Sequence, residues 1–193
     1  MYLPKTVIAI VLLAMAVSAC ETPVPARNFP EISFKHKTPY KIDVEAVEIE
    51  VMPQTPPAKG TLVKELPVPL TAVAEAWAAQ RLQAVGKSGT AVVRIEKAEM
   101  VEEKLKKTGG IKGAFTTDQT ERYSGQLQVS VSIADIRGLA LARAGATRSR
   151  TIAEDATLAE REKLWFSMVE NLGRDMDAEM DRQIPKHLSG YLR

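Results

Sequence analysis

One thiol and two imidazoles are the strongest nucleophiles and metal ligands that the chain offers at neutral pH. Cys20 follows an apolar N-terminal run, His36 lies in a proline-rich stretch, and His187 lies near the C-terminus. Neither histidine belongs to a metal-ligand spacing such as HExxH. No serine lies in a GxSxG sequence, and a Ser-His-Asp triad would have to use one of these two histidines. The sequence therefore predicts no catalytic residue and no metal site, and both histidines are expected to be solvated.

A basic, glycine-rich cluster, KKTGGIKG over residues 106–113, is the feature nearest to a phosphate-binding loop. It lacks the spacing GxxxxGK[ST], so a flexible hairpin loop is the simpler interpretation. The functional alternative is a weak contact with an anionic lipid headgroup or an acidic partner. The candidate residues of that contact are Lys106, Lys107, Lys112, Arg148 and Arg150. The two arginines share one face of a predicted strand.

Acidic side chains alternate with apolar ones in KIDVEAVEIEV, residues 41–51. Paired carboxylates can perform acid–base catalysis, but this alternation is typical of the exposed face of a strand. We therefore interpret these acids as solubilising, and we keep an envelope enzyme that uses carboxylates or a bound metal as an alternative function. The side chains concerned are Asp43, Glu45, Glu48 and Glu50. Trp77 and Trp165 lie on helical apolar stripes and are expected in the core.

Composition narrows the class of protein. The chain has 193 residues, with 26 Lys plus Arg against 24 Asp plus Glu, and this near balance is no signature of nucleic-acid binding. With a single cysteine the domain can form no internal disulfide. It must therefore be held together by its hydrophobic core.

Four segments have the period-two pattern of strands. Residues 42–51 change phase between Ala46 and Val47, which predicts one long strand with a β-bulge. A second bulge is expected within residues 91–100, where the phase shifts at Ala98. Residues 123–133 show the cleanest alternation, and a turn at Arg137-Gly138 connects them to a predicted strand over residues 139–152.

Two segments have the period of amphipathic helices. The first runs from Leu70 to Val85, with Pro69 at its start and Gly86 as its expected C-terminal cap. Thr157 and Glu160 fit a capping box at the start of the second. This long helix is expected to end or kink near Pro185.

The order strand, helix, three strands, helix (β-α-β-β-β-α) predicts an α+β fold. Two amphipathic helices can cover the apolar face of one four-stranded sheet, which gives a two-layer sandwich. The strands joined by short turns favour a mostly antiparallel sheet. We expect a single domain over residues 41–193, preceded by a leader over residues 1–19 and a tether over residues 20–40.

The leader has a charge at Lys5, an apolar run over residues 7–17, and then Ser18-Ala19-Cys20. The apolar run is too short to span a bilayer. The leader as a whole resembles the lipobox signal peptide of bacterial lipoproteins. The resemblance implies cleavage before Cys20, a covalent diacylglycerol on its sulfur and an N-acyl chain such as palmitate, with no other cofactor. An ordinary secretory signal cut after Ala19, or an uncleaved signal anchor, are the alternatives.

The tether contains four prolines within residues 21–40. In a polyproline-like conformation twenty residues reach roughly 60 Å, or less if Phe29 and Phe34 dock on the domain. Glu21 is not the aspartate that retains lipoproteins at the inner membrane in enteric bacteria. By that resemblance we expect an anchor in the outer membrane, facing the periplasm.

The order of elements over residues 40–190 resembles small envelope lipoproteins of α+β fold, namely LptE-like lipopolysaccharide-assembly lipoproteins and the auxiliary lipoproteins of ABC transporters. GIKGAFTTDQTERYSGQLQVSVSI, residues 110–133, is also similar to segments of uncharacterised lipoproteins of alphaproteobacteria. Neither resemblance has a diagnostic motif, so neither implies a functional residue. A shared fold does not establish a shared function.

The function expected from the sequence is a non-enzymatic binding or assembly module, anchored in the membrane and facing the periplasm. Its partner would be an envelope protein complex or a lipid, contacted through the protein surface or a sheet edge, and not a nucleic acid. A purely structural envelope protein is a further alternative.

Overall fold

The computed structural model describes residues 29–53, 60–62, 65–105, 119–136, 138–153 and 155–193. Cys20 and the predicted leader lie outside these ranges. In chain order the elements are β1 (Tyr40–Ile42), β2 (Ala46–Val51), α2 (Leu70–Arg81), β3 (Leu82–Ala84), β4 (Thr90–Lys104), β5 (Gln119–Asp135), β6 (Gly138–Ala153), α3 (Leu158–His187) and the 3-10 helix η3 (Ser189–Tyr191).

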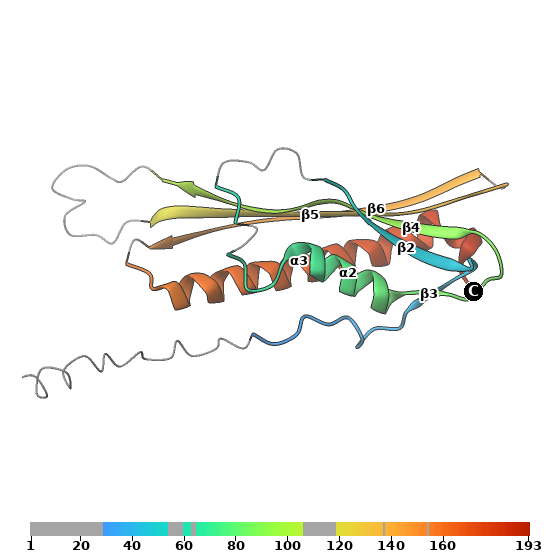
Figure 1. The fold of residues 1–193 in the computed structure, drawn as a ribbon, viewed down its shortest axis with the longest axis horizontal. Helices are drawn as coiled ribbons and strands as arrows, with labels where there is room; N and C mark the ends of the chain where they lie inside the picture. Colours follow the sequence, from blue (N-terminus) through green and yellow to red (C-terminus); the bar gives the residue numbers. More distant parts are fainter. Residues whose placement is uncertain (1–28, 54–59, 63–64, 106–118, 137, 154) are drawn as a thin grey trace, which may run out of the picture.

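Helices α2 and α3 lie side by side beneath one face of a long sheet, and the opposite face is open (Figure 1). The strand order is β2-β4-β5-β6; β2 is parallel to β4, and the other neighbours are antiparallel. A second, small sheet pairs β1 with β3 in parallel. The predicted α+β sandwich with a mostly antiparallel four-stranded sheet is confirmed, with two short strands that the sequence did not indicate.

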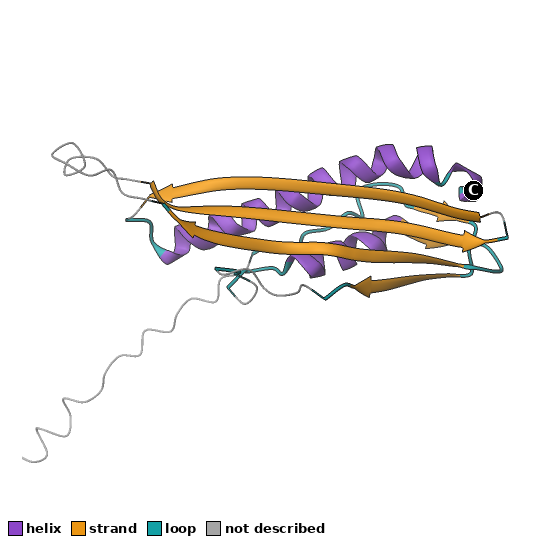
Figure 2. Cartoon of the chain, turned by 90° about the horizontal axis from the view of Figure 1, so that it is seen from above, coloured by secondary structure: helices purple, strands orange, loops and turns teal. Residues whose placement is uncertain are grey.

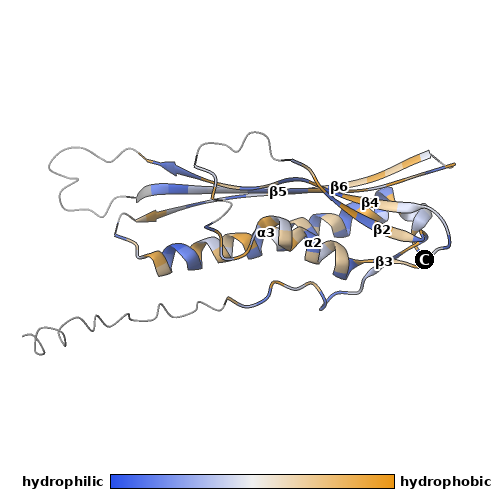
Figure 3. Cartoon of the chain, viewed as in Figure 1, coloured by the Kyte–Doolittle hydropathy of each residue, from blue (hydrophilic) through white to orange (hydrophobic). Residues whose placement is uncertain are grey.

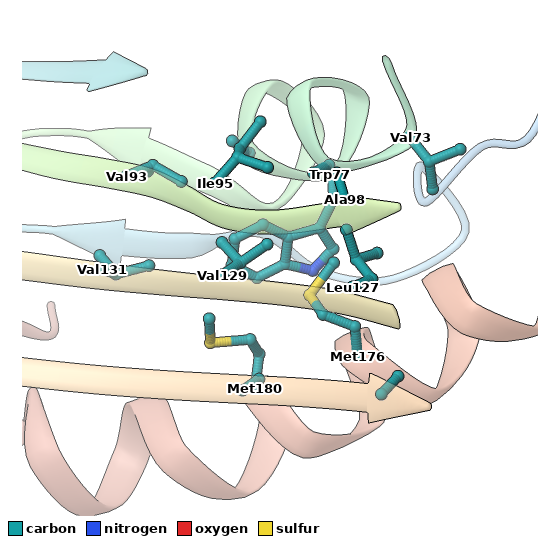
Figure 4. Packing of buried hydrophobic residues seen from close by; sticks show 14 of the residues in the cluster. Val73, Trp77, Val93, Ile95, Ala98, Leu127, Val129, Val131, Met176 and Met180 are labelled. Atoms are coloured by element: carbon teal, nitrogen blue, oxygen red, sulfur yellow. The ribbon is translucent and has the colours of Figure 1, made fainter. Parts of the chain in front are cut away.

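The core fills the space between the sheet and the two helices (Figure 4). Alternate side chains of β4 and β5 point towards the helices, and the helices meet them with one tryptophan and several methionines. The central members, all fully buried, are Val93, Ile95, Leu127, Val129, Val131, Trp77, Met176 and Met180. Burial of each large side chain is worth about 1.5–3 kcal/mol relative to exposure. Trp77 and Trp165 are both buried, as predicted.

The predicted long strand over residues 42–51 is wrong. The chain turns at residues 43–45, so that β1 and β2 belong to different sheets. Val44 is buried inside this turn, and its N–H donates to the carbonyl of Ile42. The change of phase between Ala46 and Val47 therefore lies beside a break between two sheets and not at a bulge. A bulge and a break between sheets can each shift the buried side of the chain by one residue, so the sequence pattern alone does not distinguish them.

Helix α2 is shorter than the predicted helix over residues 70–85. It ends at Arg81, where Leu82 turns extended with φ −114° and ψ 124°. Leu82–Ala84 then pair with β1, which gains more backbone hydrogen bonds than a frayed last turn. Gly86 is not a helix cap. A Cβ on Gly86 would lie 2.6 Å from the backbone nitrogen of Val44, so the glycine allows two chain segments to pass closely.

The central strands are longer than predicted. The expected bulge in β4 is confirmed between Ile95 and Lys97. Strand β4 continues to Lys104 and β5 begins at Gln119, each four residues beyond the strand predicted from the alternation. The predicted strand over residues 139–152 is also confirmed, as β6, which pairs with β5 along its whole length.

The capping box of α3 is confirmed. The Glu160 N–H donates to the Thr157 hydroxyl, and the Thr157 N–H donates to the Glu160 carboxylate at 2.7 Å. The helix continues through Pro185 and ends two residues later at His187. A proline in the last turn removes only one backbone hydrogen bond, which a helix that is packed along its length tolerates.

Residues 29–39, which we name the strap, run along α2 and α3 before β1 (Figure 1). The Phe29 ring stacks on Phe166 of α3 at 4.9 Å between ring centroids. Phe34 is only 3 % exposed. This part of the predicted tether is therefore docked on the domain through both phenylalanines.

Candidate functional site: a buried clamp and an open sheet edge

The residues predicted to contact an anion are not gathered in one described site. Lys106, Lys107 and Lys112 lie outside the described residues. Arg148 and Arg150 lie on the same side of β6, opposite Gly125 and Tyr123, on the face that the helices cover. Arg148 donates to both carboxylate oxygens of Asp175 on α3, at 2.7 and 2.9 Å. Its guanidinium is therefore held against α3, and Arg150 remains exposed.

The acidic residues of the N-terminal strands are dispersed. Asp43 is paired with Arg193 near the C-terminus, and Glu50 with Arg94 on the neighbouring strand. His36 and His187 are both exposed, as predicted. Within the described ranges, no three His, Cys, Asp or Glu side chains lie close enough to hold a metal ion.

A network of charges that is buried at its centre joins the strap to both helices. Its centre is Asp177 of α3, which is 2 % exposed. One oxygen of Asp177 accepts hydrogen bonds from Trp77 Nε1 at 2.9 Å and from Arg81 Nε at 3.0 Å, both on α2. The other oxygen lies 2.6 Å from Lys37 Nζ of the strap. We name this group of residues, together with Asp181 and Tyr40, the clamp.

Asp181, one helical turn after Asp177, completes the clamp. It accepts from Lys37 Nζ at 2.6 Å and from the Tyr40 hydroxyl at 2.7 Å, and Arg81 also donates to it. Partial burial opposes the ionisation of Asp181, but the hydrogen bonds from Lys37 and Tyr40 outweigh it and lower its pKa. Burial, reinforced by the hydrogen bond to Asp181, raises the pKa of Tyr40 to about 12.

The contacts of the clamp attach the strap to the two helices. Arg81 donates to the carbonyl of Thr38, and its guanidinium lies over the Tyr40 ring at 4.9 Å. Gln80 of α2 accepts hydrogen bonds from the Ser33 hydroxyl and the Phe34 N–H. Three elements therefore converge on a few buried charges, and the strap is fixed to the helices by directional bonds as well as by apolar contact.

Sequence reasoning missed the clamp, although a signal was present. Arg81 lies on the buried stripe of one predicted helix, and Asp177 lies next to Met176 on the buried stripe of the other. Charged residues are rarely fully buried unless they are paired. One unexplained charge on each of two helical stripes predicts a buried pair between them.

A cleft of about 350 Å³ lies beside the clamp, between the strap and α3. Phe34 and Ile32 form its apolar part. Its polar lining mixes signs, with Lys37 and Arg174 against Glu170. The cleft therefore selects no single charge, and it separates two segments that the clamp already joins.

The open face of the sheet is polar. Residues of β5 that face away from the helices are Ser124, Gln126, Gln128, Ser130 and Ser132. Ion pairs cross this face between strands, such as Arg143 with Glu96 at 3.1 Å. Hydrophilic residues also dominate much of β5 in the hydropathy view (Figure 3).

The outer edge of β6 is the longest free edge in the described part of the chain. This strand has 16 residues, and within the described ranges no segment pairs with its outer side. Asp135 and Gly138 close the two-residue turn before β6 as a hydrogen-bonded pair. Even-numbered residues of β6 therefore bond to β5, and odd-numbered ones direct their N–H and C=O groups outward.

The turn before β6 and the first residues of β6 carry large, exposed apolar side chains. Ile136 is fully exposed and Leu139 is 69 % exposed. In the figures this hairpin tip lies at the opposite end of the domain from the start of α3 (Figure 1). No described helix is both long and apolar enough to cross a membrane.

Comparisons with known proteins give a distant similarity of fold. No protein-family model and no curated protein matches the sequence. Rare lipoprotein B from Shewanella oneidensis, a solved structure, is 11 % identical with a TM-score of 0.41; the match covers 75 % of this chain and 97 % of that one. A minor lipoprotein from Acinetobacter baumannii is 15 % identical with a TM-score of 0.35, over 71 % and 94 % of the two chains. At these values the likeness assigns no function.

Proposed function

We propose that this chain is an envelope lipoprotein, anchored through Cys20, whose domain binds an extended segment of an envelope protein at the outer edge of β6. It acts as a non-enzymatic binding or assembly module. The observation that carries the proposal is the edge itself, which is long, unpaired among the described residues and, between Arg143 and Arg148, free of guarding side chains.

The anchor and the strap belong together in this proposal. Phe29 lies nine positions after Cys20, and this stretch of chain spans at most about 30 Å. From Phe29 onward the strap is docked on α3 and the clamp holds it. A lipid on Cys20 would therefore restrain the whole domain close to the membrane, because only a short stretch of chain separates Cys20 from the docked strap.

Exposed edges are normally guarded by charged side chains or proline, since a bare edge pairs with other chains. Strand β6 has three arginines that could form such a guard; Arg150 is exposed near the end of the strand, but the other two are held by acids. Arg143 reaches across the open face to Glu96, and Arg148 reaches down to Asp175. Between them the edge presents Gly145 and Thr147, which are small. An extended segment can therefore approach the backbone closely.

The position of α3 favours a single added strand over a second copy of the domain. α3 packs beneath β6, and its C-terminal half extends beyond the β6 edge in the face-on view (Figure 2). Antiparallel pairing of two β6 edges would place two α3 helices on one face. Packed helices need 8–10 Å between their axes, whereas paired strands lie about 4.8 Å apart. A single strand would instead rest on the flank of α3.

Site-specific photo-crosslinking in intact cells tests the edge. A photoreactive phenylalanine analogue replaces Thr147 on the edge, or Glu75 on the exposed side of α2 as the matched control. We expect one discrete adduct from position 147, none from position 75, and loss of the adduct when Gly145→Pro blocks an outward N–H without touching the bonds to β5. Equal adducts at both positions, or an adduct that survives Gly145→Pro, would contradict the proposal.

Cell fractionation tests the anchor separately. Cys20→Ala should abolish lipid incorporation and leave a soluble or uncleaved protein. Separation of inner and outer membranes by density then tests the expected outer-membrane location, with Glu21→Asp as the variant that should shift the protein inward if the enteric sorting rule applies. A cleaved Cys20→Ala protein that still fractionates with membranes would refute the lipid anchor.

A further inference from the structure

The end of the domain that carries the β5–β6 turn combines exposed aliphatic side chains with unpaired cations. We propose that this end is a second membrane contact, in which Ile136 and Leu139 insert into the interface of a bilayer that contains anionic lipid. The contact goes beyond the lipid anchor and rests on different residues.

Several segments meet at this end. The Glu45 N–H donates to the Gly89 carbonyl, and the Tyr191 hydroxyl donates to Asp135 at 2.8 Å. These bonds hold the β3–β4 loop, the β1–β2 turn and the C-terminal residues around the base of the hairpin. The tip is therefore supported by ordered structure, and Ile136 projects from it into water.

The tip exposes more than one large aliphatic side chain. Ile136 is fully exposed and Leu139 is 69 % exposed, and Leu141 follows on the same side of β6 as Leu139 with 37 %. Single exposed apolar residues need no explanation, whereas exposed apolar residues that cluster mark a contact surface. An apolar tip of this size matches the depth of the interface between headgroups and acyl chains.

Charge around the tip favours an anionic lipid surface over an apolar patch on a protein. Lys41 and Lys87 are exposed, as is Lys186 at the adjacent C-terminal end of α3, and none has an ion-pair partner within the described ranges. Asp43 is paired with Arg193 at this end. Asp135 accepts from the neutral Tyr191 hydroxyl and Glu45 is exposed, so the three lysines face two further acids. Each lysine near an anionic leaflet strengthens binding.

The two membrane contacts together restrict the orientation of the domain. Tyr123 packs against Trp165, next to Phe166 where the strap begins. From Tyr123 to Asp135 strand β5 rises about 40 Å, which exceeds the 30 Å or so between Cys20 and Phe29. In a domain standing upright on its tip, Phe29 would lie farther from the membrane than the chain between Cys20 and Phe29 can span. With both contacts made, the domain lies along the membrane.

The test uses the full lipidated chain in vesicles of phosphatidylethanolamine and phosphatidylglycerol. Because lipidation blocks Cys20, Ile136→Cys supplies a single thiol for a polarity-sensitive fluorophore, and Glu75→Cys on α2 is the control. We expect a blue shift and quenching by bilayer-embedded quenchers at position 136 only. Water-like emission at position 136, or equal quenching at both positions, would overturn the proposal.

A second pair of variants separates insertion from nonspecific contact. Here the fluorophore is placed beside the tip, at Lys87→Cys. The double substitution Ile136→Ser and Leu139→Ser should then shift the equilibrium between the membrane-inserted and the free tip, as this fluorophore reports it, roughly tenfold or more towards the free tip. Leu158→Ser removes an exposed leucine at the other end and should change nothing. Equal effects of both would overturn the proposal. A failed lipid anchor would show instead as a free Cys20 thiol in the purified chain.

Discussion

The clamp and the outer edge of β6 use the same residue types in opposite ways. In the clamp, Arg81 and Asp177 are 3 % and 2 % exposed, and every charge meets a partner from another element. At the edge, Arg148 and Asp175 form a pair that is a third or more exposed. Removing one partner of a buried pair leaves an uncompensated charge, whereas exposed pairs contribute little. The clamp therefore stabilises the fold, whereas the ion pairs at the edge only set the direction of their side chains.

Loss of the central carboxylate should give the largest effect. Asp177→Ala leaves Arg81 and the Trp77 N–H without their buried acceptor, and we expect a loss of about 3–5 kcal/mol in the free energy of unfolding. Urea denaturation measures it. The matched control is Asp175→Ala, which removes the acid of the exposed pair, only two residues away from Asp177 on the same helix. Similar losses in both variants would contradict the distinction between clamp and edge.

Removing the apolar peg of the strap should rank second. Phe34→Ala empties a slot against Gly173 and should cost about 3 kcal/mol. The strap should also become sensitive to proteolysis near its lysines. Phe29→Ala is the comparison, because its ring stacks near the surface at the start of the strap. If Phe29→Ala proved the more destabilising, Phe34 would not be the main apolar attachment of the strap.

The fold was predictable from the sequence where patterns were long. The alternation in residues 123–133 and the capping box at Thr157 and Glu160 each predicted one element, and both are confirmed. What failed depended on contacts distant in sequence. Leu82–Ala84 have the apolar spacing to extend a helix, and only their pairing with β1 makes them a strand.

The candidate surfaces were less predictable. The length of β6 and its alternating small residues indicated a strand, but nothing in the sequence says that β6 lies at an edge. That position follows from the strand order β2-β4-β5-β6. The clamp joins Lys37 to residues 140 or more positions later, which no local period reveals. Its one signal was the charge on each helical stripe.

Alkaline pH should weaken the clamp before the rest of the domain. The pKa of Tyr40 is raised to about 12, and that of Lys37 also lies above its ordinary value because its bonds to Asp177 and Asp181 outweigh the effect of burial. Their stabilisation is complete below pH 10, where both unfolded groups are protonated, and is lost as pH rises through the folded values. Proteolysis of the strap should therefore increase from pH 10 to 12.

Tyr40→Phe isolates the tyrosine. The variant loses one hydrogen bond to Asp181, worth about 1 kcal/mol at neutral pH, and should show a shallower decline in stability between pH 10 and 12. Tyr123, whose pKa burial also raises to about 12, titrates in both proteins and serves as the common background. An identical alkaline slope in wild type and Tyr40→Phe would mean that ionisation of Tyr40 does not contribute to the loss of stability.

The smallest effect on stability is expected at the edge, where it separates structure from binding. Arg148→Ala should change the free energy of unfolding by less than about 1 kcal/mol, because the pair with Asp175 is exposed. Asp175→Ala should be equally mild, but it releases the Arg148 guanidinium to cover the backbone beside Thr147. Crosslinking at position 147 should then fall in Asp175→Ala and persist in Arg148→Ala. If both variants crosslink alike, tying back this arginine is not what keeps the edge open.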